Sequence, residues 1–108
     1  MGYYADIFGE LTTHSDKEAK LVVDLLKASE LYDDVWAESS DVFTEDRGRK
    51  YREENYPQIY QVISPYLCPG SNFECIGEEG EHWKHVFEGG QWVEYESELR
   101  WINPHPFA

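Results

Sequence analysis

A pair of glycines, Gly89 and Gly90, divides the most aromatic part of the chain, which runs from Gly77 to Trp101. Residues alternate in character on both sides of this pair, and two glycines can both take a positive φ without a steric penalty. The pattern therefore predicts a β-hairpin with a two-residue loop. Such a loop fixes the register of the two strands from the turn outward. The expected pairs are Glu88 with Gln91, Phe87 with Trp92, His85 with Glu94, and Trp83 with Glu96.

This register predicts which side chains share each face of the hairpin, because side chains alternate along a strand. One face carries aromatic and acidic residues, namely Trp83, His85, Phe87, Trp92, Glu94, Glu96 and Glu98. The other face carries Val86, Val93, Tyr95, Leu99 and Trp101, with Lys84 able to extend its amine to water. We expect the second, more apolar set to face the core.

The aromatic and acidic face is then the candidate binding surface. In one interpretation, helices cover its rings while its carboxylates meet water. In the other, the whole face is exposed, and its rings and carboxylates anchor a protein interface or enclose a cation.

A row of glutamates, Glu94, Glu96 and Glu98, occupies every second position of this face. Their carboxylates should stand about 6.6–6.8 Å apart, roughly twice the rise per phosphate in one DNA strand. The row could partly mimic a nucleic-acid backbone. A solvated outer face of a strand is the simpler interpretation.

The N-terminal part of the chain contains the signals of a strand followed by a helix. Residues 3–12 alternate, and the side chains expected on one face are Ala5, Ile7, Gly9 and Leu11. Ser15 and Glu18 form a capping box, so a helix should run from about Asp16 to Leu31. Its expected apolar stripe is Leu21, Val22, Leu25, Leu26 and Ala28.

The middle of the chain is harder to assign. Residues 36–43 fit a short strand or a loop that crosses the core. The highly charged residues 44–54 could start a second helix, which Pro57 would kink or restart because proline removes a donor and clashes with the preceding turn. The buried stripe expected next is Tyr56, Ile59, Tyr60 and Ile63, and residues 72–76 follow as a strand.

The resulting order of elements is β-α-(β)-α-β-β-β. It predicts one α+β domain over residues 1–108, with two helices packed on one face of a mostly antiparallel sheet of about four strands. A chain of this length can build one modest core but not two. An exposed edge on such a sheet would allow a homodimer.

The charge balance narrows the class of partner. The chain has 22 acidic residues against 9 Lys and Arg, a formal net charge of −13. Such a surface repels phosphate backbones and anionic lipids within about 8–10 Å in physiological salt, so we expect no direct nucleic-acid binding and no membrane binding. A protein partner with a basic surface is favoured.

Targeting signals are also missing from the sequence. No run approaches the ~18–20 apolar residues of a membrane span, and the first residues lack the basic and apolar regions of a signal peptide. We therefore expect a cytoplasmic protein in which Cys68 and Cys75 are reduced.

Scarce basic residues gather in one short segment. The basic cluster consists of Arg47, Arg49, Lys50, Tyr51 and Arg52. It could grip a phosphate or a nucleotide, with the tyrosine stacking on a base. Alternatively, the neighbouring acidic side chains neutralise the cluster within the chain; these are Glu45, Asp46, Glu53 and Glu54.

Signals of catalysis are weak. His82 and His85 lie three residues apart on a strand, which places them on opposite faces and prevents them from sharing a metal. A catalytic pair of His85 and Glu94 would require a cleft around it. No nucleophile follows a strained glycine turn. We expect no enzyme, no metal and no cofactor.

The favoured function is a small acidic binding or inhibitor protein that occupies a basic surface of a protein partner. Compact, acidic and aromatic-rich domains of this kind are typical of inhibitors from phages and mobile elements, including nucleic-acid mimics. The alternative is a small-ligand protein that binds or sequesters a nucleotide or another anion at the basic cluster.

Overall fold

The computed structural model describes residues 3–97 of the chain, and within this range the backbone forms one antiparallel sheet and two α-helices. The strands are β1 (Tyr3–Thr12), β2 (Asp34–Glu38), β3 (Asp41–Tyr51), β4 (Asn72–Gly77), β5 (His82–Glu88) and β6 (Gln91–Ser97). The helices are α1 (Asp16–Ala28) and α2 (Tyr56–Ile63), and short 3₁₀ turns flank α2 at Glu53–Asn55 and Ser64–Tyr66.

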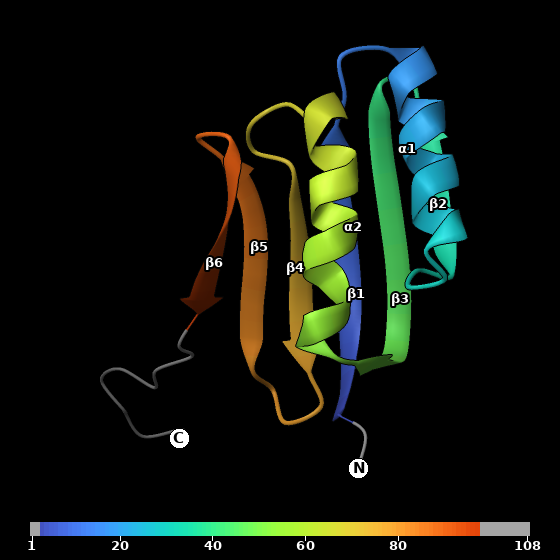
Figure 1. Cartoon of the computed structure of the whole chain (residues 1–108). Helices are drawn as coiled ribbons and strands as arrows, with labels where there is room; N and C mark the ends of the chain where they lie inside the picture. Colours follow the sequence, from blue (N-terminus) through green and yellow to red (C-terminus); the bar gives the residue numbers. More distant parts are fainter. Residues whose placement is uncertain (1–2, 98–108) are drawn as a thin grey trace, which may run out of the picture.

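The strand order is β2-β3-β1-β4-β5-β6, and every neighbouring pair is antiparallel. The segment from β1 to β4 follows the β-α-β-β-α-β order of the ferredoxin-like topology, in which β3 lies between β1 and β2. The β5–β6 hairpin extends the sheet beyond β4. Both helices lie on the same side of the sheet (Figure 1).

The α+β class is confirmed, but the prediction of about four strands was wrong, because the described residues form six. Where the sequence predicted one short strand or a loop over residues 36–43, the structure has two strands, β2 and β3, which meet at a tight turn where Ser39 has a φ of 54°. The charged segment predicted to start a helix is instead most of β3. Its side chains alternate between the core and the open face, and long-range pairing with β1 outweighs the local preference of charged residues for a helix.

The core lies between α1, α2 and the sheet. Predicted and observed faces of β1 agree, since Ala5, Ile7, Gly9 and Leu11 are all buried. Half of the predicted capping box is present: the Glu18 amide donates to Ser15 Oγ at 3.2 Å, while the Glu18 carboxylate lies 3.1 Å from His14 Nδ1 instead of reaching the Ser15 amide. The predicted stripe of α2 is confirmed in full.

The stripe predicted for α1 was only partly correct. Leu21 is 40% exposed and Ala28 is exposed, whereas Val22 and Leu26 are buried as expected. Residues Ala19, Val22, Val23 and Leu26 form the buried face. The helix also ends at Ala28, where the Ser29 amide donates to the Leu25 carbonyl, rather than at the predicted Leu31.

The register predicted for the β5–β6 hairpin is confirmed at all four predicted pairs. Gly89 and Gly90 form the loop, with φ values of 59° and 77°. The prediction of which face packs on the core was wrong. Val86, Val93 and Tyr95 lie on the open face of the sheet, and the helix-facing side carries the aromatic and acidic set.

Pairing with β4 is the physical reason for this orientation. Phe73 and Cys75 of β4 are buried under the helices, and they lie opposite His85 and Trp83 of β5. Side chains of directly paired residues share a face, so β5 must present these residues to the helices. Of the predicted residues, Glu98, Leu99 and Trp101 lie outside the described residues.

Both cysteines of the chain are free thiols. Cys68 is half-buried and Cys75 is buried, and burial raises the pKa of the Cys75 thiol to about 12. Over residues 3–97, no helix is long and apolar enough to cross a membrane.

The core also buries one carboxylate, that of Asp46 on β3, which is 2% exposed. Its Oδ1 accepts hydrogen bonds from the amides of Asp33 and Asp34, at 2.7 Å and 3.4 Å. Its Oδ2 is buried and has no hydrogen-bond partner among the described residues. Burial raises the pKa of this carboxyl above its ordinary value, although the two amides and the nearby Arg49 oppose the shift.

The raised pKa of Asp46 predicts a pH dependence of stability. The folded state holds a proton at pH values where the unfolded chain has lost it, so the Asp46 contribution to stability should fall as pH rises from about 4 through the raised pKa. Asp46→Asn keeps an oxygen for both amides and removes the charge. The free energy of unfolding of this variant, minus that of the parent, should therefore grow between pH 4 and 7 in urea titrations. A difference that does not change with pH would contradict the prediction.

Candidate functional site

The helix layer is narrower than the sheet on which it packs. α1 contacts β2 and β3, and α2 lies beside α1, with its Tyr60 stacked on Phe73 of β4. No described helix lies over the hairpin of β5 and β6, which extends past α2 (Figure 1). Among the described residues, the helix-facing side of this hairpin is therefore only partly covered: His85 and Phe87 are buried, Trp92 is half-buried and Glu94 is exposed.

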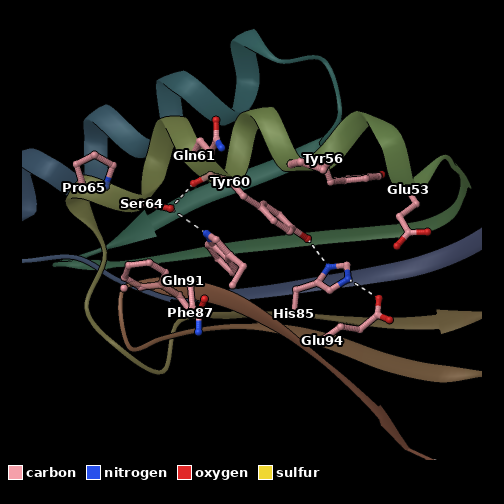
Figure 2. A pocket seen from close by; sticks show the side chains of 13 residues that line it. Glu53, Tyr56, Tyr60, Gln61, Ser64, Pro65, His85, Phe87, Gln91 and Glu94 are labelled. Carbon is pink, nitrogen blue, oxygen red and sulfur yellow. Dashed lines mark hydrogen bonds and ion pairs between the residues drawn. The ribbon is translucent and has the colours of Figure 1, made fainter.

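A groove of about 780 Å³ occupies this position. One wall comes from α2 and its flanking 3₁₀ turns, and is formed by Glu53, Tyr56, Pro57, Tyr60, Gln61, Ser64 and Pro65. The floor comes from the hairpin, and is formed by His85, Phe87, Gly90, Gln91, Trp92 and Glu94. We call this feature the α2–hairpin groove (Figure 2).

A stack of aromatic rings gives the groove its shape. Trp92 stacks on Tyr60, with ring centroids 4.3 Å apart and an interplanar angle of 22°. Tyr60 in turn stacks on Phe73 of the core, at 5.3 Å and 10°. The indole Nε1 of Trp92 donates to Ser64 Oγ at 2.8 Å. The rings are therefore held in place before any ligand arrives, which lowers the entropy cost of binding.

A chain of hydrogen bonds joins α2 to both strands of the hairpin. The Tyr60 hydroxyl lies 2.7 Å from His85 Nδ1, and His85 Nε2 lies 2.9 Å from a carboxylate oxygen of Glu94 (Figure 2). Burial raises the pKa of Tyr60 well above its ordinary value, so its hydroxyl stays protonated. The Tyr60 hydroxyl can donate to His85 Nδ1 while His85 Nε2–H donates to Glu94. In this arrangement the hydroxyl and both ring nitrogens each have a hydrogen-bond partner.

Charge is distributed unevenly along the groove. Glu53 and Glu94 lie at one end with His85, and Pro65 and Phe87 lie at the other (Figure 2). The Glu94 side chain is 41% exposed although it pairs with His85. Neither lysine nor arginine appears among the described residues that line the groove. Aromatic faces next to unneutralised carboxylates attract cations.

Trp83 and Glu96, the other described residues predicted on this face, lie away from the groove. Trp83 packs on Tyr51, with ring centroids 5.3 Å apart, and on Tyr3 at 6.5 Å. Glu96 is opposite Trp83 and exposed. The structure therefore brings together His85, Phe87, Trp92 and Glu94 from the predicted set, and separates Trp83 and Glu96 from them.

Sequence reasoning missed the α2 wall of the groove. Tyr56 and Tyr60 were predicted as buried core, and each is buried, yet each also borders the groove. Ser64 carried no signal of its own, although it accepts the hydrogen bond from Trp92. The wall could have been found from the helix stripe only if the hairpin face had been assigned correctly.

The basic cluster is largely engaged within the chain. Arg47 pairs with Glu45 at 3.0 Å and lies over the ring of Phe8. Arg49 pairs with Asp33 at 2.8 Å and donates to the carbonyl of Glu30. Tyr51 stacks on Tyr56 with ring centroids 5.0 Å apart.

Three members of the basic cluster, Arg47, Lys50 and Arg52, are nevertheless exposed. Their exposure leaves anion or nucleotide binding at the cluster as an alternative hypothesis. A panel of nucleotides in a thermal-shift assay tests it directly.

Comparison of the chain with known protein families, with curated protein sequences and with solved structures finds no match. The ferredoxin-like arrangement of β1 to β4 hosts many unrelated activities, so it implies none by itself. The function must therefore be inferred from the α2–hairpin groove and its chemistry.

Proposed function

We propose that this protein binds a basic segment of a partner protein in the α2–hairpin groove and thereby occupies the basic surface of that partner. The observation that carries the proposal is the combination, in one groove, of the stacked rings of Tyr60 and Trp92 with the carboxylates of Glu53 and Glu94. A lysine or arginine side chain is the protein group that suits both features. Its stem packs on the rings and its charge meets the carboxylates.

The rest of the surface supports the same class of partner. A net charge of −13 attracts a basic protein over the Debye length and speeds its association. Inhibition by occupancy, as in phage-encoded inhibitors, requires only such binding. In a narrower version of the proposal, the glutamate row mimics nucleic acid. The Glu94 carboxylate would then bind the partner while it also pairs with His85.

The geometry of the groove favours binding over catalysis. His85 uses both ring nitrogens in hydrogen bonds, to Tyr60 and to Glu94, so neither nitrogen is free to accept a proton from a substrate. Ser64 Oγ accepts from Trp92 and donates to the Tyr60 carbonyl. The cleft that a catalytic pair would need is present, but the polar groups at its floor hold the structure together.

We also propose that the protein is cytoplasmic, and its two free thiols are consistent with this compartment.

Reversing one charge at the groove should weaken binding of a basic ligand. Glu53 is exposed on the wall of the groove, so Glu53→Lys should reduce the affinity for a basic peptide about tenfold, which corresponds to about 1.4 kcal/mol. The probe is a labelled 15-residue peptide of Lys, Arg, Leu and Phe, followed by fluorescence anisotropy. A matched peptide with Glu in place of each Lys and Arg should not bind.

Glu38→Lys provides the control for this experiment. Glu38 is exposed on β2, at the opposite edge of the sheet from the hairpin, and the variant makes the same change in net charge. At physiological salt its effect should stay within about twofold, because charges beyond about 8 Å are screened. Equal losses for Glu38→Lys and Glu53→Lys would show that net charge alone drives binding. Failure of the basic peptide to bind the parent protein would count against the proposal itself.

A further inference from the structure

We propose that the bound segment is an α-helix of the partner, which lies alongside α2 as a third helix on the sheet. This inference rests on the proposed function, since it names the conformation of the basic segment that the α2–hairpin groove receives. The evidence comes from the width of the uncovered sheet, from the direction of the groove and from the chemistry along it.

The width of the uncovered sheet matches one helix. Neighbouring strands lie about 4.8 Å apart, and packed helices lie about 8–10 Å apart, so one helix covers about two strands. Two helices, α1 and α2, are therefore wide enough to cover the part of the sheet formed by β1 to β4. The hairpin of β5 and β6 adds the width of two strands, and no helix among the described residues covers it (Figure 1).

The groove follows the axis of α2. Its lining runs along the wall from Glu53, in the 3₁₀ turn before the helix, to Pro65 in the turn after it (Figure 2). At about 1.5 Å per residue this wall is on the order of 20 Å long, which accommodates a partner helix of about three to four turns. Two helices packed side by side on one sheet face is the arrangement that α1 and α2 already show.

The chemistry along the groove specifies the sequence of the partner helix. On the floor, the half-buried ring of Trp92, backed by the buried ring of Phe87, faces an apolar stripe whose residues should recur at i, i+3 or i+4, and i+7. Because Glu53 and Glu94 lie at one end of the groove, we expect Lys or Arg at the matching end of the partner helix. The side-chain amides of Gln61 and Gln91 can form hydrogen bonds with polar residues beside this apolar stripe.

An extended segment fits these observations less well. A strand added to the sheet would pair with the backbone of β6, which is an edge strand. It would lie beside the sheet, in the plane of β6, and would contact neither Tyr60 nor the α2 wall. The rings and carboxylates of the groove would then have no role.

Selection of random 15-residue peptides displayed against the full chain tests the inference. We expect enriched peptides to combine a helical period of apolar residues with Lys or Arg near one end. Proline placed in the centre of an enriched peptide should weaken its binding at least tenfold, because proline breaks a helix. Alanine at the same position is the matched control and should leave the affinity within about twofold.

Each alternative result has a distinct meaning. Enriched peptides that are basic but alternate with a period of two, or that tolerate the central proline, would overturn the helix and leave the proposed function standing. Enriched peptides without a basic excess, or no enrichment, would overturn the proposed function. Competition by a synthetic peptide of residues 98–108 would identify a segment of this chain as the occupant and would overturn the inference.

Discussion

Replacing Phe73 with alanine should lower the free energy of unfolding by about 3–5 kcal/mol, the cost of removing a fully buried phenylalanine ring and leaving a cavity. Phe73 is 0% exposed and stands where the core meets the groove. Its ring stacks on Tyr32 at 5.2 Å and on Tyr60 at 5.3 Å, and lies 5.9 Å from the ring of Trp92. These neighbours are large rings held by their own contacts, so they cannot readily collapse into the space.

The backbone next to Phe73 is equally constrained. A Cβ added at Gly9 would lie 2.8 Å from the Phe73 ring and 2.5 Å from Thr44 Oγ1, so the ring packs directly on the glycine. Urea unfolding measures the effect, with Phe43→Ala as the matched control. Phe43 is half-buried on the open face and stacks on Trp36 at 5.8 Å, so its loss should cost about half as much or less. Equal costs for the two variants would contradict the assignment of Phe73 to the centre of the core.

Replacing Trp92 with alanine should have the largest effect on binding, a loss of at least about 30-fold in affinity for the basic peptide, or about 2 kcal/mol. Trp92 offers a half-buried ring on the floor of the groove, and Tyr60 and Ser64 fix its orientation. Residues that are large, aromatic and already ordered are the ones that dominate binding energy. Fluorescence anisotropy with the basic peptide measures the loss.

Two further variants separate binding from folding. Trp36→Ala removes a tryptophan of similar area from the open face at the far edge of the sheet, and the affinity should stay within about twofold of the parent. Trp92→Phe keeps a ring for the ligand but loses the hydrogen bond to Ser64, so it should fall between the parent and Trp92→Ala. If Trp36→Ala and Trp92→Ala weaken binding equally, the groove is not the binding site.

The parts of the fold that the sequence predicted depend on local interactions. The Gly89-Gly90 loop needs only its own backbone to set the register of the hairpin. The N-cap hydrogen bond of α1, from the Glu18 amide to Ser15 Oγ, joins two residues only three positions apart. The buried stripe of α2 follows from helical periodicity alone. Each of these signals is complete within a short window of sequence, and each prediction was confirmed.

The parts that could not be predicted depend on contacts between distant segments. The charged side chains of β3 lie mostly on the open face or pair with other segments, as Arg49 does with Asp33. Their abundance therefore does not indicate whether the segment forms a helix or a strand. The orientation of the hairpin follows from Phe73 and Cys75 on β4, which no pattern within the hairpin reveals. Counting apolar residues favoured Val86 and Val93 for the core, yet the rings of Phe87 and Trp92 bury more area.

The candidate site was accordingly predicted in part. The hairpin residues of the floor could be named from the sequence, because they share one strand face. The wall could not, because its position depends on which face of the hairpin turns toward α2. The association of Glu53 with Glu94 in one groove, on which the proposed function depends, is a product of the tertiary fold.

The burial of Cys75 provides a built-in reporter of motion in this sheet. Its thiol is directly opposite Trp83, beneath the helix layer, and with a pKa of about 12 it is almost entirely protonated at neutral pH. Alkylating reagents therefore modify it only in molecules where the core around β4 has opened, whereas the half-buried Cys68 supplies an internal reference in the same chain. The ratio of the two modification rates reports how often this part of the core opens, without any engineered label.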